Sequence, residues 1–95
     1  MEISGRGTQD IYDGTDSKAA RRVLPWHLHQ AATDLLDALE AATSLNDLAA
    51  VPGARLEKLR GDRKGQHSLR INDQYRICFT WTKDGAVGVE IVDYH

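Results

Sequence analysis

The chain has 95 residues, of which 41% are hydrophobic and 27% are charged, with a formal net charge of −2. A chain of this length forms one small domain, and its composition is that of an ordinary globular protein, which argues against a disordered or fibrous class. The single cysteine excludes an intramolecular disulfide and a cysteine-based metal site, so Cys78 is interpreted as a buried structural thiol. The sequence has no apolar run typical of a signal peptide or a membrane helix. We therefore expect a single cytoplasmic domain over residues 1–95.

The net charge hides an uneven distribution along the chain. Residues 54–84 carry eight Lys and Arg residues against four Asp and Glu, whereas the other residues carry four against ten. A basic segment on an otherwise acidic domain suits a polyanion such as nucleic acid. A solvated basic surface is the alternative explanation of the same charges.

Helical patterns fill the first half of the chain. Capping residues and apolar positions three or four residues apart predict helical segments at 8–14, 18–24, 26–43 and 45–50. In the first of these, Thr8 is expected to be the N-cap and Gly14 to end the helix. Trp26 and Trp81 are expected to lie in the core or between helix and sheet. The polar residues 1–7 are interpreted as an edge strand or a loose tail.

The second half of the chain has the alternation of strands. Apolar residues at every second position predict strands at 54–59, 66–71, 75–82 and 87–92. Polar turns separate them at 61–65, 72–73 and 84–85. Helices followed by such a meander predict an α+β fold, a small curved antiparallel sheet with the N-terminal helices packed on one face. Arg70 and Arg76 alternate with the apolar residues of their strands and are expected on the other face.

Several cations are candidates for binding an anion. A guanidinium in the middle of a strand, as at Arg76, must meet solvent, a carboxylate or an anionic ligand, and a structural salt bridge is the alternative to a ligand. Arg60, Arg63 and Lys64 surround a turn between two glycines, where the backbone can approach a phosphate. This turn is not a P-loop, because the lysine lacks a following Ser or Thr and no helix begins there. A solvated turn is the alternative.

The chain ends on Asp93, Tyr94 and His95. A carboxylate, a phenol and an imidazole can each move or position a proton, although a frayed polar end is the alternative interpretation. His27 and His29 are two residues apart in a predicted helix and point to different sides, so they predict no metal site. His67 belongs to the apolar face of its strand and is expected in the core or at its rim.

Two stretches carry a resemblance to a known family. The run LRGDRKGQHSLRINDQYRICFTW and the ending VEIVDYH resemble the HigB group of toxins in the RelE/ParE superfamily, and the similarity extends back through SKAARRVLP and ATSLNDL. The resemblance implies a RelE-like toxin of a type II toxin–antitoxin module, a ribosome-dependent endonuclease that cleaves mRNA in the ribosomal A site. It also implies a HigA-like helix-turn-helix antitoxin, through which the complex would bind operator DNA, and it implies no metal and no cofactor.

The resemblance assigns roles by position. Arg60 falls on the basic residue of the family's LKG turn, Arg76 on its strand arginine, and Asp93, Tyr94 and His95 on its terminal active-site cluster. These five residues are the predicted catalytic set. Three further cations are predicted to bind RNA: Arg63, Lys64 and Arg70.

The chain also departs from the family pattern. Arg60 stands where many relatives have Lys, and its high pKa favours an electrostatic role over proton transfer. Glu57 stands where some relatives have His and would oppose phosphate binding, and the start MEISGRG replaces an apolar strand of the IKSF type. Two other functions therefore stay open: a non-catalytic module of the same fold that binds its antitoxin, and a ParE-like gyrase poison, which the DYH ending disfavours.

Overall fold

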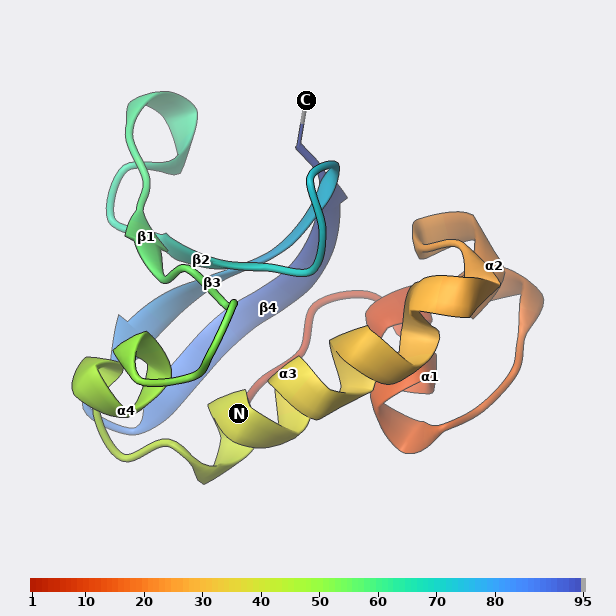
Figure 1. The fold of residues 1–95 in the computed structure, drawn as a ribbon, viewed down its shortest axis with the longest axis horizontal. Helices are drawn as coiled ribbons and strands as arrows, with labels where there is room; N and C mark the ends of the chain where they lie inside the picture. Colours follow the sequence, from red (N-terminus) through yellow and green to blue (C-terminus); the bar gives the residue numbers. More distant parts are fainter. Residues whose placement is uncertain (95) are drawn as a thin grey trace.

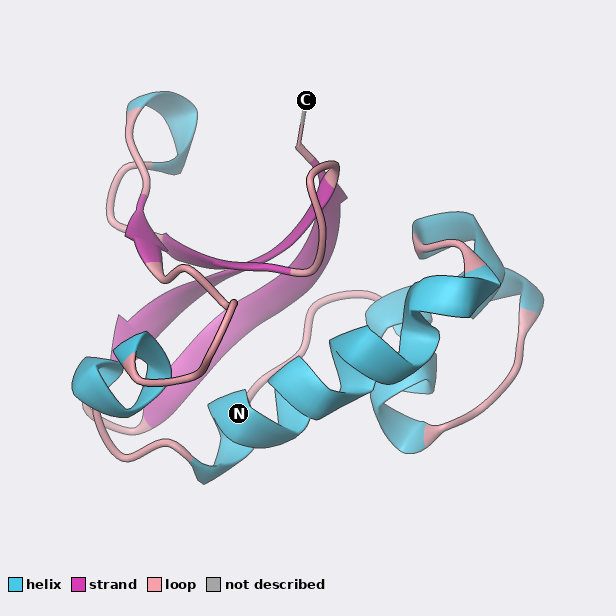
Figure 2. Cartoon of the chain, in the orientation of Figure 1, coloured by secondary structure: helices cyan, strands magenta, loops and turns pink. Residues whose placement is uncertain are grey.

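The structure, a computed structural model, describes residues 1–94. Its helices are α1 (Arg6–Asp13), α2 (Lys18–Val23), α3 (His29–Ala41) and α4 (Leu45–Ala49), with 3-10 turns η1 (Trp26–Leu28) and η2 (Gly61–Arg63). Its strands are β1 (Glu57–Lys58), β2 (His67–Arg70), β3 (Tyr75–Thr82) and β4 (Gly85–Asp93). The α-helices precede the sheet in the chain, as the colours of Figure 1 show, and Figure 2 distinguishes helices from strands. None of the helices in residues 1–94 is both long and apolar enough to cross a membrane.

The four strands form one open sheet in the order β1-β2-β3-β4, with every neighbouring pair antiparallel. The helices pack against one face of this sheet (Figure 1). Ile11, Leu36 and Leu39 from the helices share the core with strand residues such as Leu69 and Phe79, all of them buried. The predicted α+β architecture is therefore confirmed. Within the described residues, no α-helix lies over the opposite face of the sheet (Figure 1).

The start of the chain is an edge segment, as one of the two interpretations proposed. Ile3 forms a parallel bridge with Val89 of β4, and the N–H groups of Glu2 and Ser4 donate to carbonyl oxygens of that strand, both at 2.9 Å. The helix that follows begins earlier than predicted, at Arg6, so Thr8 is not its N-cap. Thr8 instead lies inside the helix, buried, and its hydroxyl accepts a hydrogen bond from the N–H of Ile91 at 3.3 Å.

Gly14 ends α1 as predicted, with a left-handed backbone (φ 75°) that glycine adopts without strain. The predicted helix at 26–43 is divided, because Pro25 is followed by one 3-10 turn before α3 starts at His29. That turn leaves Trp26 on the surface with 67% of its area exposed, so its predicted core contact is wrong. Trp81 packs against the core, as predicted.

Two features of the sheet also differ from the prediction. The strand expected at 54–59 is reduced to Glu57–Lys58, because Arg55 has a left-handed backbone (φ 46°) that interrupts extended pairing. The turn between β2 and β3 is longer than two residues, because the Asn72 side chain accepts hydrogen bonds from the N–H groups of Gln74 and Tyr75 at 2.9 and 2.8 Å. This side-chain turn is typical of Asn.

Candidate functional site

The face of the sheet opposite the helices is called the open face here and is defined by Ser68, Arg76, Cys78 and Glu90. The strand register unites these residues, because Cys78 lies opposite Ser68 on β2 and opposite Glu90 on β4, with Arg76 two residues away on the same side. Ser68 and Cys78 are buried, yet neither belongs to the core cluster under the helices. They are therefore buried on the open-face side of the sheet.

Arg76 occupies the centre of the open face, where its guanidinium contacts side chains from three parts of the described chain. Its Nη1 donates a hydrogen bond to Ser68 Oγ at 2.8 Å, and its Nη2 lies 3.4 Å from Glu57 Oε2. Its guanidinium carbon lies 5.5 Å from the centroid of the Tyr94 ring, within the range of a cation–π contact. Arg76 is thus on the face that alternation predicted. It makes a structural ion pair and also stands beside an exposed aromatic ring.

The end of β4 is fixed by the turn that precedes β3. Gln74 accepts a hydrogen bond from the N–H of Tyr94 at 2.6 Å, and its side-chain amide donates to Asp93 Oδ2 at 3.1 Å. Tyr94 is 40% exposed, so its phenol is accessible from solvent. Asp93 pairs with Tyr75, which puts it on the other side of the strand from Arg76. The third member of the predicted cluster, His95, lies outside the described residues.

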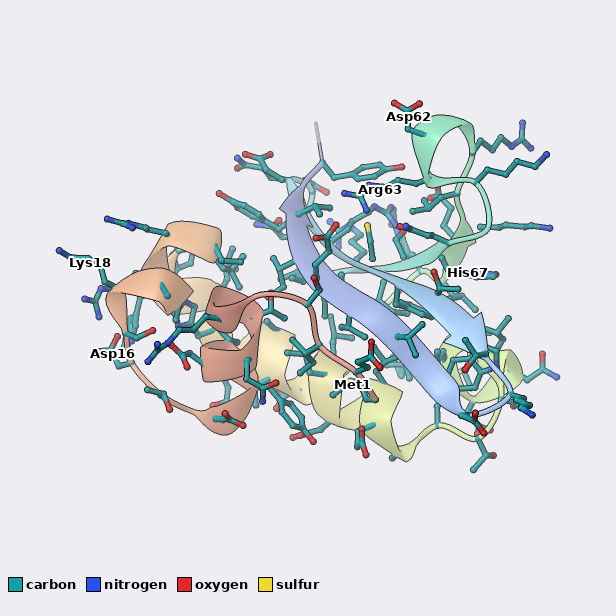
Figure 3. The ribbon with its side chains drawn as sticks, turned by 180° about the vertical axis from the view of Figure 1, so that it is seen from behind. Met1, Asp16, Lys18, Asp62, Arg63 and His67 are labelled. Carbon is teal, nitrogen blue, oxygen red and sulfur yellow. The ribbon has the colours of Figure 1, made fainter. Side chains whose placement is uncertain are left out.

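Residues 60–65 are called the η2 loop, and they rise on the same side of the sheet as the end of β4 (Figure 1). Arg63 reaches from this loop to β4, where its Nη2 lies 2.9 Å from Glu90 Oε1 (Figure 3). Its Nη1 donates to Gln66 Oε1 at 3.0 Å. Burial raises the pKa of Cys78; Glu90 adds to this shift, whereas Arg63 and Arg76 oppose it.

A second group of cations lies at the base of the η2 loop. Lys58, Leu59, Arg60, Gly61 and Lys64 line a hollow of about 440 Å³. Leu59 is buried and its N–H donates to the Gln66 carbonyl oxygen at 2.9 Å, which fixes the hollow to the sheet. The cations of this hollow are available to bind phosphate groups.

The structure does not bring Arg70 into this group. Its backbone lies opposite Arg76 in the register, but its guanidinium pairs with Asp73 in the turn after β2. The hydrogen bond and the charge of Arg70 lower the pKa of Asp73. Arg70 therefore neutralises a local carboxylate.

The predicted site residues did not include two members of the open face, Ser68 and Glu90. The alternation of β2 places Ser68 on the same face as Arg70, and the same periodicity in β4 could have found Glu90. What the sequence did not show was that Glu90 is the partner of Arg63.

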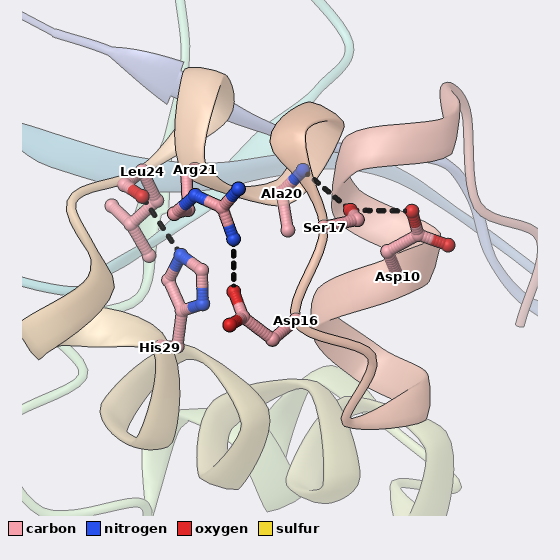
Figure 4. A network of polar contacts seen from close by, with 7 residues as sticks. All are labelled: Asp10, Asp16, Ser17, Ala20, Arg21, Leu24 and His29. Carbon is pink, nitrogen blue, oxygen red and sulfur yellow. Dashed lines mark hydrogen bonds and ion pairs between the residues drawn. The ribbon is translucent and has the colours of Figure 1, made fainter.

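The polar side chains of the helical layer make hydrogen bonds that stabilise the helices. Ser17 caps α2 by accepting from the N–H of Ala20 at 3.0 Å and donates to Asp10 at 2.7 Å, as Figure 4 shows. His29 Nε2 lies 2.8 Å from the carbonyl oxygen of Leu24. Within residues 1–94 no three His, Cys, Asp or Glu side chains are grouped as metal ligands would be.

Comparisons with known proteins find one family and individual relatives. The chain matches, over residues 7–95, a family described as the RelE-like toxin of type II toxin–antitoxin system HigB. It is 35% identical over 95 residues to Toxin HigB-1 of Vibrio cholerae serotype O1 (strain ATCC 39315 / El Tor Inaba N16961), covering 100% of this chain and 96% of that protein. It is also 31% identical over 70 residues to an uncharacterized protein of Haemophilus influenzae (strain ATCC 51907 / DSM 11121 / KW20 / Rd), covering 74% of this chain and 64% of that protein.

Proposed function

Since the chain belongs to the HigB family of RelE-like toxins of type II toxin–antitoxin systems, we propose that it is an endoribonuclease that cleaves mRNA on the ribosome. The observation that carries the proposal is the pairing of Arg76 with the Tyr94 ring on a sheet face that no α-helix of the described residues covers. RNA presents a phosphate beside an aromatic base, and a guanidinium beside an exposed ring can bind both.

In this proposal the cations bind phosphates. Arg76 holds the scissile phosphate, and Arg60 and Lys64 bind the RNA backbone at the hollow below the η2 loop. Tyr94 orients the nucleotide through its ring or shares in proton transfer through its phenol. Asp93 is bonded to Gln74 on the far side of the strand, so its proposed part is to fix the end of β4, and His95 is the proposed general base.

The cleavage itself needs only groups of the RNA and the protein. The base takes the proton of the 2′-hydroxyl, the 2′-oxygen forms a bond to the adjacent phosphorus, and the bond from phosphorus to the 5′-oxygen breaks. The Tyr94 phenol donates a proton to the 5′-oxygen and recovers one from the protonated base, which leaves a cyclic phosphate and a 5′-hydroxyl. Positioning of the hydroxyl and stabilisation of the extra negative charge on phosphorus lower the barrier, and Arg76 supplies the second effect.

Replacement of Arg76 tests the proposal. In a translation reaction with purified ribosomes, the wild-type protein is expected to generate new mRNA 5′ ends that primer extension maps, and Arg76→Ala is expected to lose at least about 100-fold in rate, the cost typical of removing one charge-stabilising donor. Arg22→Ala, at an exposed position of α2, removes the same charge on the helical side and should cleave normally. Full activity of Arg76→Ala, or cleavage by the wild type without ribosomes, would reject the proposed mechanism.

A non-catalytic binding module is the second candidate, and the ion pairs of the open face favour it. Glu57 and Glu90 occupy Arg76 and Arg63, and both carboxylates repel a phosphate. A binding module would cause no growth arrest when expressed without its antitoxin. Growth arrest that depends on residues 94–95 supports the endonuclease, whereas arrest accompanied by DNA damage and intact mRNA supports a gyrase poison.

The module's antitoxin is the partner that the family implies. We propose that it is a HigA-like helix-turn-helix protein that also carries the complex to operator DNA, and that both proteins act in the cytoplasm, where the ribosomes are. Co-purification of the chain with the product of the neighbouring gene, followed by a gel-shift assay on the upstream DNA, tests the partner and its operator role separately.

A further inference from the structure

The ion pair between Arg63 and Glu90 joins parts of the chain that the strand order separates. Arg63 belongs to the connection between β1 and β2, and Glu90 lies on β4, at the opposite edge of the four-stranded sheet. To make this contact, the η2 loop must fold back over the open face, which brings the Arg63 side chain to Glu90. This contact therefore connects the η2 loop directly to the far strand.

Arg63 is held at both ends of its guanidinium. Nη2 contacts Glu90 at 2.9 Å and Nη1 donates to Gln66 at 3.0 Å, and Gln66 is itself bonded through its carbonyl to Leu59. A guanidinium with two fixed acceptors has fewer donors left for a phosphate than a free one. The geometry of Arg63 is that of a structural connector, although the sequence predicted an RNA contact.

The thiol of Cys78 lies below this ion pair and can be used to detect its opening. Cys78 faces Glu90 across β3 and β4, is fully buried, and lies outside the core under the helices. It is the only cysteine of the chain. The charges of Arg63 and Glu90 both act on this thiol, so the ion pair lies near it, and loosening of the η2 loop is expected to expose Cys78.

We propose that the Arg63–Glu90 ion pair is a clasp that closes the η2 loop onto β4, so that both residues position the loop cations Arg60 and Lys64 relative to Arg76. As a role in RNA cleavage this inference rests on the proposed function, whereas the clasp as a structural device does not. The RNA is then held by Arg60, Lys64 and Arg76, and Arg63 contacts Glu90 both before and after RNA binds.

Glu90→Gln separates the clasp from a direct RNA contact, because the two roles predict opposite signs. If Arg63 binds RNA itself, loss of the Glu90 carboxylate frees the Arg63 guanidinium and removes one negative charge from the site. Cleavage should then become faster. If the pair is a clasp, the loop loosens and kcat for cleavage falls by about two- to fivefold, which corresponds to the about 0.4–1 kcal/mol expected of a partly exposed ion pair. Faster cleavage by Glu90→Gln would overturn the proposal.

The thiol gives a second readout that needs no activity. Under native conditions Glu90→Gln is expected to raise the alkylation rate of Cys78 by about threefold or more, because local opening controls access to a buried group. Asp16→Asn is the matched control, since it removes the carboxylate of another exposed Arg pair, with Arg21 at 2.5 Å on the helical side. It should leave Cys78 protected. Urea denaturation of each variant separates local opening from a loss of global stability.

The charge-reversed double variant, Arg63→Glu with Glu90→Arg, completes the test. It restores an ion pair of opposite polarity and is expected to recover Cys78 protection and most of the cleavage rate, whereas a direct phosphate contact at position 63 would stay lost. Unchanged alkylation in Glu90→Gln at unchanged global stability would overturn the clasp. If the wild-type protein cleaves no mRNA, the proposed function fails, and the alkylation rates still decide whether the clasp exists.

Discussion

Arg76 has neighbours that act on a bound phosphate in opposite ways. The Tyr94 ring and the Ser68 hydroxyl orient the guanidinium without neutralising it, whereas the carboxylate of Glu57, 3.4 Å away, competes with any anion for it. Glu57 is half exposed, so solvent screens this competition. In the free protein Arg76 is therefore paired with Glu57, and this pairing lowers the affinity for RNA only modestly.

Glu57→Gln is expected to strengthen RNA binding by about two- to fivefold, because removing the competing charge recovers up to about 1 kcal/mol at an exposed pair. Fluorescence anisotropy with a labelled RNA oligonucleotide measures this change. Asp37→Asn removes one negative charge from the exposed side of α3 and should bind as the wild type does. Weaker RNA binding by Glu57→Gln would mean that Glu57 helps binding by orienting the Arg76 side chain more than it hinders binding by competing with the phosphate.

His67 is the second residue with a measurable electrostatic consequence. Its ring stacks on Phe79 with centroids 6.1 Å apart, and its Nδ1 is buried without a hydrogen-bond partner among the described residues. Burial, and then the charge of Lys58, lower the pKa of His67 from its usual 6.5. Between the lowered and the usual pKa the unfolded chain binds more protons, so His67 contributes its stability fully above about pH 6.5 and loses it as pH falls through the lowered pKa.

The free energy of unfolding is therefore expected to fall between about pH 7.5 and pH 5, and part of this fall should disappear in His67→Gln. Urea denaturation at the two pH values measures it. His27→Gln, at an exposed position, should keep the wild-type dependence. An identical fall in His67→Gln would assign the whole effect to other groups.

At the scale of elements, the helical layer depends on one close contact between α1 and α2. A Cβ on Gly7 would lie 2.6 Å from the carbonyl oxygen of Ala19 and closer still to Val23 Cγ2. The absence of a side chain at Gly7 therefore lets the two helices approach, and α1 in turn reaches the sheet through the hydroxyl of Thr8.

Gly7→Ala is expected to destabilise the protein by about 1–3 kcal/mol, because overpacking outweighs the about 1 kcal/mol that alanine gains as a helix former. Thermal or urea unfolding measures the loss. Gln9→Ala, on the exposed side of the same helix, should change stability by much less. A Gly7→Ala variant as stable as the wild type would show that α2 can move away from α1.

The elements also show how much of the fold and of the candidate site can be predicted from the sequence. Alternation in β3 was enough to place Arg76 on the open face, because the period of a strand is local. Trp26 was placed wrongly, because a single 3-10 turn after Pro25 rotates it out of the helical pattern. The bond between Arg63 and Glu90 could not be predicted, since it depends on how the η2 loop folds back over the sheet.

On the scale of the whole molecule, the charges are separated into two regions. The basic segment at 54–84 forms the η2 loop and β1 to β3, whereas the helical half is acidic. An acidic region repels RNA, so a polyanion is directed to the sheet side even though the chain has a net charge of −2. The separation of charges therefore determines which side of the protein meets RNA, and it does so more than the net charge does.

The salt dependence of RNA binding tests this separation. If Arg60, Lys64 and Arg76 each neutralise one phosphate, the logarithm of the affinity should fall with the logarithm of salt concentration with a slope of about −2, at about −0.7 per contact for single strands. The double variant Arg60→Ala with Lys64→Ala should reduce the slope to about −0.7. Lys18→Ala with Arg22→Ala removes the same charge from α2, at exposed positions, and should weaken binding little and leave the slope unchanged. Equal slopes for the two double variants would mean that RNA binding depends only on the net charge of the protein. The phosphates of the RNA would then not bind at the hollow below the η2 loop.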